Sequence, residues 1–477
     1  MVKRSKCPIS AAEVFNVKNL GRWQANAGKG RQATKDEVLI IEPIESTSEA
    51  NWRLPPSKSH LIRFALIAAQ TEAPVRLTGT ASAGEDALSM ARCLSQMGVD
   101  ISLDDDSWTI RGVGKDGFTR PNALLNCGNS GTTFRLLTAL CARLPFTVML
   151  DGDRSLRRRG GDALWSALEQ CEVELSHGHG AETLPLMMRG RWNPRLIDLD
   201  ISQSSQPLSA LRLAALAAPQ EFTLRLSGAA VSRRHYELSD ALARMSGSPD
   251  EIALTCGELV LHPWNPTLPN EILMPGDASL AVLAMLFCRT HSSAIKLLNW
   301  PENDDCLGHE IIAELAPTLG LQWTRTLEGE SEVVEISSLP DISKFAEIDL
   351  RDANDLITPL AVILALGEGG VISGAGHAVH KESNRIEKTA EMLAKFAISV
   401  MPTSDGLEIQ GGQIPQCPDE VVLTHGDHRL QMSAVILASK CGGVIQGPRL
   451  HQVSFPEFLT TLKNSGLVFS SSIQSIE

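Results

Sequence analysis

The feature that most limits the possible folds of this chain is an alternation between two kinds of predicted helix. One kind is apolar on every face and begins with small or polar residues. It occurs six times, at 57–69, 129–144, 204–219, 277–290, 352–369 and 427–440. A helix without a polar face has to be buried. The chain must therefore build enough surrounding structure to cover six such helices.

The second kind of helix is amphipathic and leads through a turn into a strand-like stretch. It also occurs six times, roughly every 70–76 residues, at 85–103, 161–176, 236–254, 308–326, 386–402 and 455–472. Short β-like runs separate the two kinds, among them 146–152, 222–228, 294–300 and 369–376. We predict an α/β fold of six repeats, arranged as two similar domains of three repeats each.

Composition narrows the functional class. The chain has 477 residues and a formal net charge of -13, which argues against a nucleic-acid-binding protein. It contains no run of 18 apolar residues, so we predict no membrane span. Ten cysteines without a CxxC pair or a His/Cys cluster indicate free thiols in a reducing compartment, and no zinc site or disulfide framework.

The first 35 residues differ from the rest of the chain. They hold eight Lys or Arg and one acidic residue, and they lack the apolar stretch of a secretory signal. A transit peptide, a disordered tail and a start codon placed too far upstream all fit this composition. We leave the segment out of the fold prediction.

Polar residues gather where the apolar helices begin. Ser57-Lys58-Ser59, residues 128–132 and Ser204-Ser205-Gln206 each precede or open such a helix. Helix N-termini present unpaired N–H groups and a positive dipole end, which favour anions. Serine and asparagine at these places also cap helices for stability alone, and that alternative stays open.

Cationic residues lie beside other helix starts. Four Arg occupy six positions within 154–159, Lys381 and Arg385 precede an amphipathic helix, and Arg429 opens a buried one. Arginine recognises phosphate and carboxylate groups through two parallel hydrogen bonds. In an acidic protein this pattern indicates a local site for a small polyanionic ligand. A solvated charge run is the alternative for 154–159.

Two carboxylates complete this set. Asp355 lies in the first turn of a very apolar helix, and Glu382 lies between cations. A buried carboxylate beside cationic groups is suited to general acid–base chemistry. Asp355 could instead be only a charge that stabilises a helix N-terminus.

Together these motifs resemble the enolpyruvyl transferase family, and within it the 5-enolpyruvylshikimate-3-phosphate synthases. The resemblance runs from about residue 38 to the C-terminus. Its motifs follow the family's order and spacing: PPSKSHLIR, CGNSGTTFR, RSLRRRGG, SSQ, SRRH, GDAS, DANDLITPLAV, HKESNR and GDHR.

The resemblance implies a fold of two domains, each built from three βαβαββ-type units as an inverse α/β barrel and joined by two chain crossovers. Residues 1–37 would then be a basic extension. Residues 38–55 with 276–477 would form the first domain and 56–275 the second, with crossovers near 56 and 275.

The resemblance also implies an activity: transfer of the enolpyruvyl group of phosphoenolpyruvate to the 5-hydroxyl of shikimate 3-phosphate, with release of phosphate. The family needs no metal or organic cofactor. The implied partners are these two small molecules, with no nucleic acid and no membrane. We expect a monomer in the cytoplasm, with organelle import through residues 1–35 as the alternative.

Site residues follow from the same motifs. Shikimate 3-phosphate would be bound by Lys58, Ser59, Arg63, Ser204, Ser205, Gln206, Ser232, Asp355 and Lys381. Phosphoenolpyruvate would be bound by Lys58, Gly131, Arg159, Gln206, Arg385 and Arg429. The resemblance implies that Asp355 accepts the proton of the attacking hydroxyl. Glu382, with Lys58, would handle the proton at the methylene carbon of phosphoenolpyruvate.

The chain departs from the family pattern at several positions. Pro56 replaces a usual Gly, Val453 a usual Lys, Gly160 a usual Pro and Asn384 a usual Asp, and His235 stands where some members have Tyr. The loss of the Lys removes a contact expected for the phosphate of phosphoenolpyruvate. One lost charged contact costs about 1.5–3 kcal/mol of binding.

Two alternatives stay open on the sequence. One is a sister enolpyruvyl transferase with another phosphorylated acceptor, although residues 104–126 lack the Cys on which the UDP-N-acetylglucosamine type relies. The other is a catalytically silent relative that binds a polyanion, which Pro56 and Val453 motivate. Replacing Asp355 by Ala would separate an enzyme from a binder.

Overall fold

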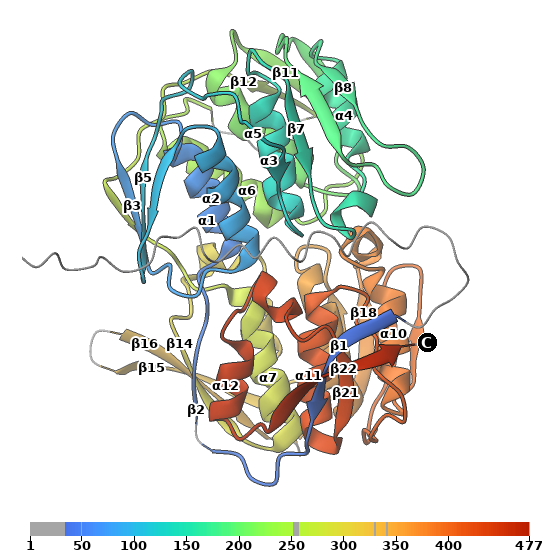
Figure 1. Cartoon of the computed structure of the whole chain (residues 1–477). Helices are drawn as coiled ribbons and strands as arrows, with labels where there is room; N and C mark the ends of the chain where they lie inside the picture. The colour runs from blue at the N-terminus through green and yellow to red at the C-terminus, as the bar shows by residue number, and fades with distance from the viewer. Residues whose placement is uncertain (1–33, 49, 251–256, 329–330, 340–341, 477) are drawn as a thin grey trace, which may run out of the picture.

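The computed structural model describes the chain except for residues 1–33, 49, 251–256, 329–330, 340–341 and 477. Two bodies with separate hydrophobic cores are stacked on each other (Figure 1). Domain I, as we define it, comprises β1, β2, β14–β22 and α7–α12. Domain II comprises α1–α6 and β3–β13. Most of the predicted basic extension lies outside the described residues, but residues 34–37 already belong to β1, where they pair with β22.

The six apolar helices form as predicted and are buried along almost their whole length. Domain II holds α1 (Lys58–Ala68), α3 (Gly131–Cys141) and α5 (Gln206–Ala214), and domain I holds α7 (Ala281–His291), α9 (Ile357–Leu366) and α11 (His428–Cys441). In each domain they pack mainly against one another and against the inner faces of the sheets. Burial follows from the absence of any polar face.

The amphipathic helices cover these cores. They are α2 (Glu85–Gln96), α4 (Asp162–Glu169), α6 (Arg233–Met245), α8 (Ile311–Leu315), α10 (Arg385–Lys395) and α12 (Phe458–Asn464). Within the predicted helix, turn and strand at 308–326, helix α8 has only five residues, and the strand is the start of β15 (Leu321–Glu328). Pro317 limits it, since proline has no N–H for the helix and disfavours helical backbone in the residue before it.

In the part of the chain that the structure describes, six small sheets surround the helices, one for each repeat. Domain II has the strand orders β13 (Glu271–Leu273), β3 (Val75–Thr78), β5 (Ser107–Arg111), β4 (Asp100–Leu103); β6 (Leu125–Asn126), β7 (Val148–Asp151), β9 (Leu186–Arg189), β8 (Glu174–Ser176); and β10 (Leu196–Asp200), β11 (Phe222–Ser227), β12 (Glu258–Leu261). Domain I has β15 (Leu321–Glu328), β16 (Ser331–Ser338), β14 (Ala294–Leu298), β2 (Ala50–Arg53); β17 (Ala346–Asp349), β18 (Gly369–Ser373), β20 (Leu407–Gln410), β19 (Val400–Pro402); and β21 (Gly443–Gln446), β1 (Thr34–Ile41), β22 (Phe469–Ile476).

The chain passes between the domains by exchanging strands. Strand β2 precedes α1 in sequence but pairs in parallel with β14 of domain I, and β13 precedes α7 but pairs in parallel with β3 of domain II. Between them the two connections run side by side, joined by hydrogen bonds from Ser57 N to Pro275 O (2.8 Å) and from Asp277 N to Pro55 O (2.9 Å). The exact domain boundaries near 56 and 275 stay a prediction.

The two domains contact each other beyond these connections. Arg233 on α6 pairs with Asp352 of domain I (Nε to Oδ2, 3.0 Å), and Arg234 pairs with Glu310 (Nη2 to Oε1, 3.1 Å). The structure therefore holds the domains against each other, and residues from both can share one cleft. No helix among the described residues is long and apolar enough to cross a membrane.

Candidate active site

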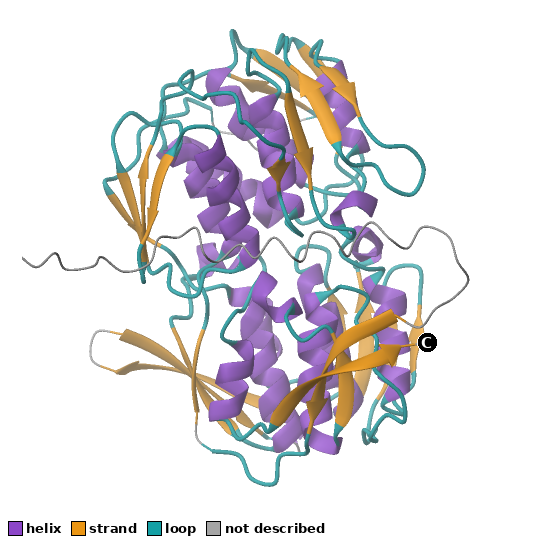
Figure 2. Ribbon diagram, in the orientation of Figure 1, coloured by secondary structure: helices purple, strands orange, loops and turns teal. Residues whose placement is uncertain are grey.

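Several of the predicted site residues lie at helix starts on the boundary between the domains. In Figure 2 the helices of both domains run toward this boundary. Lys58, Gly131 and Gln206 are the first residues of α1, α3 and α5. Asp355 lies in the short 3-10 helix Asn354–Leu356 directly before α9, and Arg429 is the second residue of α11. Segments far apart in sequence thus contribute to one region.

The centre of this region is the guanidinium group of Arg385, which three carboxylates surround. It donates to Asp355 (Nη1 to Oδ1, 2.6 Å), to Glu382 (Nη2 to Oε2, 2.6 Å) and to Asp427 (Nε to Oδ2, 2.8 Å). Lys381 lies 3.9 Å from the Asp355 carboxylate. The two carboxylates predicted for acid–base chemistry therefore share one buried cation.

Arg429 joins the same cluster from α11. It lies 3.8 Å from Asp355 Oδ2 and is held by Ser279, through its backbone oxygen (2.8 Å) and its hydroxyl (2.6 Å). Its Nε is buried and has no hydrogen-bond partner among the described residues. A buried donor without a partner favours an anionic ligand at this place.

Arg159 brings domain II to this cluster. Its guanidinium lies 3.3 Å from Glu382 Oε1 and also donates to the backbone oxygen of Asn129. A Cβ at Gly131 would lie 3.4 Å from Arg159 Nη1 and 2.8 Å from Arg135 Nη1. Glycine at the start of α3 therefore leaves room for two guanidinium groups beside a helix N-terminus.

The side chain of Gln206 is held by residues near the start of α3. Its side-chain oxygen accepts from Arg135 (2.9 Å), and its amide nitrogen donates to Thr132 Oγ1 (3.2 Å). The neighbouring Ser205 does not cap α5 and instead donates to the Ser232 carbonyl at 2.9 Å. Ser204 contacts only the backbone N–H of Gln206 in this structure (3.2 Å), so its predicted role has no further support here.

Two more residues predicted for shikimate 3-phosphate, Ser232 and Arg63, lie in the wall of the cleft near α1 and the start of α6. Ser232 directly precedes α6, and its hydroxyl lies 3.3 Å from Nε2 of His377 in domain I. Arg63 is fully buried behind Ser59, whose carbonyl accepts from its Nη1 at 2.9 Å, and its Nη2 donates to the His235 carbonyl at 3.2 Å. Burial lowers the pKa of Arg63 to about 10. Arg63 therefore supports the backbone of this wall.

Lys58 pairs with Asp86, a residue that we did not predict from the sequence. Its ammonium donates to Asp86 Oδ2 on α2 at 2.8 Å, and Asp86 Oδ1 is buried without a partner among the described residues. Burial raises the pKa of Asp86 despite this pairing. In sequence Asp86 has the appearance of an ordinary first-turn acid of an amphipathic helix, and only the contact of α1 with α2 reveals its place in the cleft.

The electrostatics fix the charge states. Burial opposes ionisation of both acids. Lys381, Arg385 and Arg429 nevertheless hold the pKa of Asp355 well below its usual range, and Arg385 and Arg159 do the same for Glu382. For Lys58, the carboxylates of Asp86, Glu382 and Asp355 outweigh burial and raise the pKa. At neutral pH, Asp355 and Glu382 are therefore ionised and Lys58 is protonated.

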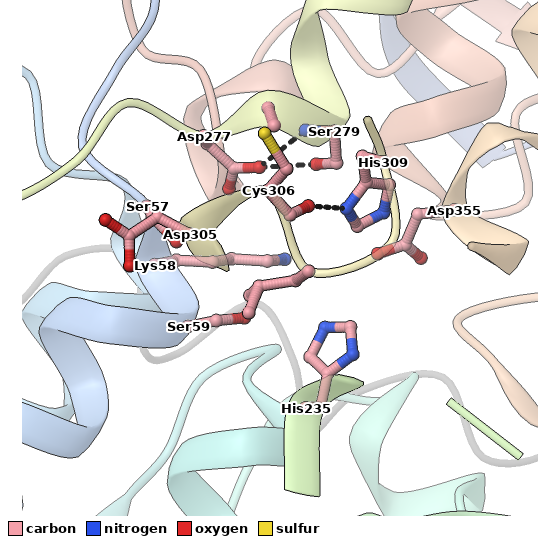
Figure 3. A pocket seen from close by; sticks show the side chains of 12 residues that line it. Ser57, Lys58, Ser59, His235, Asp277, Ser279, Asp305, Cys306, His309 and Asp355 are labelled. Carbon is pink, nitrogen blue, oxygen red and sulfur yellow. Dashed lines mark hydrogen bonds between the residues drawn. The ribbon is translucent and has the colours of Figure 1, made fainter. Parts of the chain in front are cut away.

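A small cavity of about 10 Å³ opens within this cleft (Figure 3). Side chains from both domains line it, including Lys58, Ser59, His235, Asp277 and Asp355. Asp277 is itself engaged as the cap of the following turn and accepts from Ser279 N at 3.1 Å. The cavity lies between domains that already touch.

Capping explains some of the polar helix starts and not others. Ser130 caps α3 and accepts from Thr133 N at 3.2 Å, and Asn384, one of the departures from the family pattern, caps α10 in the same way (Glu387 N, 3.3 Å). Ser57 makes no cap for α1; its hydroxyl lies 2.8 Å from His60 Nδ1. The capping alternative therefore holds at α3 and α10 but not at α1 or α5.

Val453 stands where the family usually has a Lys. It ends a 3-10 turn (Leu450–Val453) that packs against α2. A Cβ added at Gly84, directly before α2, would lie 2.4 Å from the Val453 carbonyl oxygen. The backbone at 453 therefore approaches domain II closely, while its side chain offers no charge.

Comparison with known proteins identifies the family. A model of EPSP synthase (3-phosphoshikimate 1-carboxyvinyltransferase) matches residues 44–462. The chain is 34% identical over 388 residues to the 3-phosphoshikimate 1-carboxyvinyltransferase of Syntrophomonas wolfei, covering 78% of this chain and 87% of that protein. It is 30% identical over 464 residues to the same enzyme of Bradyrhizobium diazoefficiens, covering 92% and 97%.

Solved structures of known proteins are similar to this chain over most of its length. EPSP synthase from Acinetobacter baumannii superimposes with a TM-score of 0.71 at 25% identity, covering 91% of this chain and all of that one. The enolpyruvyl transferase NikO from Streptomyces tendae shares the fold, with a TM-score of 0.70 at 16% identity, and covers 92% of this chain. These matches confirm the predicted two-domain α/β fold and the transferase class. The chain belongs to the EPSP synthase (3-phosphoshikimate 1-carboxyvinyltransferase) family.

Proposed function

We propose that this protein transfers the enolpyruvyl group of phosphoenolpyruvate to the 5-hydroxyl of shikimate 3-phosphate and releases phosphate. Family membership supports this activity, as the motifs predicted. The observation that carries it here is the cluster in which Asp355 and Glu382 share Arg385 (2.6 Å each) at a boundary that Arg159 and Lys58 reach from the other domain.

Charge explains why two anionic substrates can meet in this cleft. Phosphoenolpyruvate and shikimate 3-phosphate repel each other unless cations surround them. Lys58, Lys381, Arg159, Arg385 and Arg429 supply five positive charges within one region, as the mutual effects on their pKa values and their contacts indicate. The same cations stabilise negative charge on the departing phosphate.

Proton transfer is assigned to the two ionised carboxylates and Lys58. The 5-hydroxyl oxygen bonds to C2 of phosphoenolpyruvate while its proton passes to Asp355 and a proton is added at C3. Loss of a proton from C3 then restores the double bond as the C2–phosphate bond breaks. We assign the C3 proton to Glu382 and Lys58. Bound anions raise the pKa of both carboxylates, which makes them stronger bases in the complex than in the free protein.

Both domains contribute residues to each substrate. We assign Gly131, Arg159, Arg385 and Arg429 to phosphoenolpyruvate, with Lys58 and Gln206 shared by both substrates. We assign Ser59, Arg63, Ser204, Ser205, Gln206, Ser232, Asp355 and Lys381 to shikimate 3-phosphate. Closure of the domains over both substrates would exclude water and fix the geometry of attack.

We also propose that the protein works as a monomer in the cytoplasm. All five cations of the site come from a single chain. The eight cysteines that the structure describes are free, which is typical of a reducing compartment. The prediction that no metal or organic cofactor is required stays a prediction.

The test is phosphate release by the purified protein from phosphoenolpyruvate and shikimate 3-phosphate, with each substrate omitted in turn. We expect release only with both present, and a product whose mass equals the acceptor plus the enolpyruvyl group. Release with another phosphorylated alcohol but not with shikimate 3-phosphate would support the sister-transferase alternative. No release by folded protein that still binds phosphoenolpyruvate would support the silent relative.

A further inference from the structure

His309 lies in the cleft but belongs to none of the assigned substrate residues. It follows Gly308 just before α8, and its side chain is 3% exposed. Its ring lines the small cavity together with Ser59, His235 and Asp355 (Figure 3). In that view the ring edge directed away from Cys306 lies beside Asp355.

Hydrogen bonding fixes which ring nitrogen of His309 carries the proton. Nδ1 lies 2.8 Å from the carbonyl oxygen of Cys306, and a carbonyl can only accept. Nδ1 is therefore the protonated nitrogen. Burial, together with Arg429, lowers the pKa of His309 despite Asp355 and Asp277, so the ring is neutral and Nε2 is a hydrogen-bond acceptor.

This acceptor has no partner. Nε2 of His309 is buried and makes no hydrogen bond with any residue that the structure describes. An unpaired buried acceptor lowers stability, so its presence in a cleft favours a donor supplied by a ligand. His235, whose ring centroid is 6.3 Å from that of His309, likewise has a buried Nδ1 without a described partner. Two unsatisfied imidazoles thus flank the same small space.

The hydrogen-bonding groups of the substrates determine which of them can donate to His309 Nε2. Phosphate and carboxylate oxygens of the ionised substrates only accept hydrogen bonds, so they are repelled by a neutral Nε2. A hydroxyl can donate, and of the two substrates only the acceptor carries free hydroxyls. Apart from Lys58, which both substrates would share, no residue assigned to phosphoenolpyruvate lines the cavity.

We propose that His309 Nε2 accepts a hydrogen bond from a hydroxyl group of the acceptor substrate and so orients the acceptor ring against Asp355. This inference rests on the proposed function, because it takes the acceptor to be a polyhydroxylated anion. His309 would then be a binding residue that selects acceptors with a hydroxyl at this place.

Two variants separate binding from structure. In His309→Asn the amide nitrogen can still donate to the Cys306 carbonyl, but no atom replaces Nε2. In His309→Gln the amide oxygen can reach the place of Nε2. We expect His309→Asn to weaken shikimate 3-phosphate binding, measured by calorimetry, by about tenfold. Its KM for phosphoenolpyruvate should stay within about twofold of the wild-type value, and His309→Gln should recover most of the loss.

Deoxy analogues of shikimate 3-phosphate, each lacking one hydroxyl, supply the decisive control. For one analogue, wild type and His309→Asn should bind equally, because the interacting group is gone. Equal binding of shikimate 3-phosphate itself by wild type and folded His309→Asn would overturn the proposal. So would an equal loss for every analogue with no recovery in His309→Gln. A wild-type protein that binds no shikimate 3-phosphate at all would refute the proposed function as well.

Discussion

Two buried arginine clusters in this molecule have similar chemistry and different surroundings. In domain II, Arg212 on α5 is fully buried and pairs with Asp240 (Nε to Oδ1, 2.8 Å) and Asp250 (3.7 Å), under the ring of Trp264 at 5.3 Å. In domain I, Arg385 is equally buried and pairs with Asp355, Glu382 and Asp427.

The difference lies in what each cluster faces. The described partners of Arg212 all come from its own domain, and none of them lies at the domain boundary. The Arg385 cluster lies at the domain boundary, where Arg159 approaches Glu382 from the other domain and Arg429 approaches Asp355. A buried ion cluster therefore indicates a ligand site when cations from separate elements converge on it at the boundary between the domains. The following predictions test that distinction.

The largest effect is expected in the cluster inside domain II. Arg212→Met removes the buried cation shared by Asp240 and Asp250, which keep only the partly exposed Arg244 and His262 as partners. This change should lower the free energy of unfolding by about 3–5 kcal/mol. The folded fraction should keep wild-type substrate affinities. Chemical denaturation measures this, with Arg225→Met as the matched control. Arg225 is half-exposed and pairs with Glu258 on the surface, so its loss should leave the free energy of unfolding nearly unchanged. Loss of substrate affinity in folded Arg212→Met would contradict the distinction.

At the boundary the same kind of change should affect binding more than stability, because Glu382 keeps Arg385 as its partner when Arg159 is removed. Arg159→Met removes one proposed contact to phosphoenolpyruvate and should weaken its binding by about 1.5–3 kcal/mol, roughly ten- to a hundredfold. Steady-state KM values for each substrate measure this. Arg157→Met is the control, since Arg157 pairs with Asp151 of its own domain. If both variants raised KM equally, the assignment of Arg159 would be wrong.

Acid should weaken the boundary cluster through Glu382. Its pKa is depressed in the folded protein, so its contribution to stability is complete above the unfolded pKa of about 4.5 and is lost as pH falls below it. Glu382→Gln should therefore flatten the decline of unfolding free energy below that pH. The change in slope can reach about 1.4 kcal/mol per pH unit. Parallel curves for variant and wild type would show that Glu382 titrates normally.

The smallest effect is expected from restoring a charge. Val453→Lys places a cation on the turn that packs against α2 and should lower the KM for phosphoenolpyruvate by up to about fivefold, or about 1 kcal/mol. Val453→Met is the uncharged control of similar length. An unchanged KM in the Lys variant would indicate that the phosphate is already fully held by other cations.

Much of the fold was predictable because the residue pattern of each helix shows which of its faces must be buried. The apolar helices α7 and α9 have no polar face, and they appear within a few residues of the predicted ranges. The polar helix starts likewise predicted Lys58, Asp355 and Arg429 as neighbours in space, because helices that enter a shared boundary bring their N-termini together.

What remained unpredicted depends on contacts between distant segments. Asp86 and His309 have ordinary local sequences, and their unpaired buried atoms exist only because α1 packs on α2 and the domains meet. The exchange of β2 and β13 was implied only by the family resemblance, with its crossovers near 56 and 275. The residue pattern did not predict it, since a short strand gives no sign of which sheet it joins.

The most direct test of the boundary cluster as catalytic machinery is an Asp355→Asn variant in which binding and turnover are measured on one preparation. The variant keeps the size of the side chain but cannot accept a full proton. We predict that turnover falls by about 10²–10⁴-fold, while the variant stays folded and still binds both substrates. Turnover within a fewfold of wild type would contradict the account, because Asp355 would then be only a charge that stabilises the start of α9.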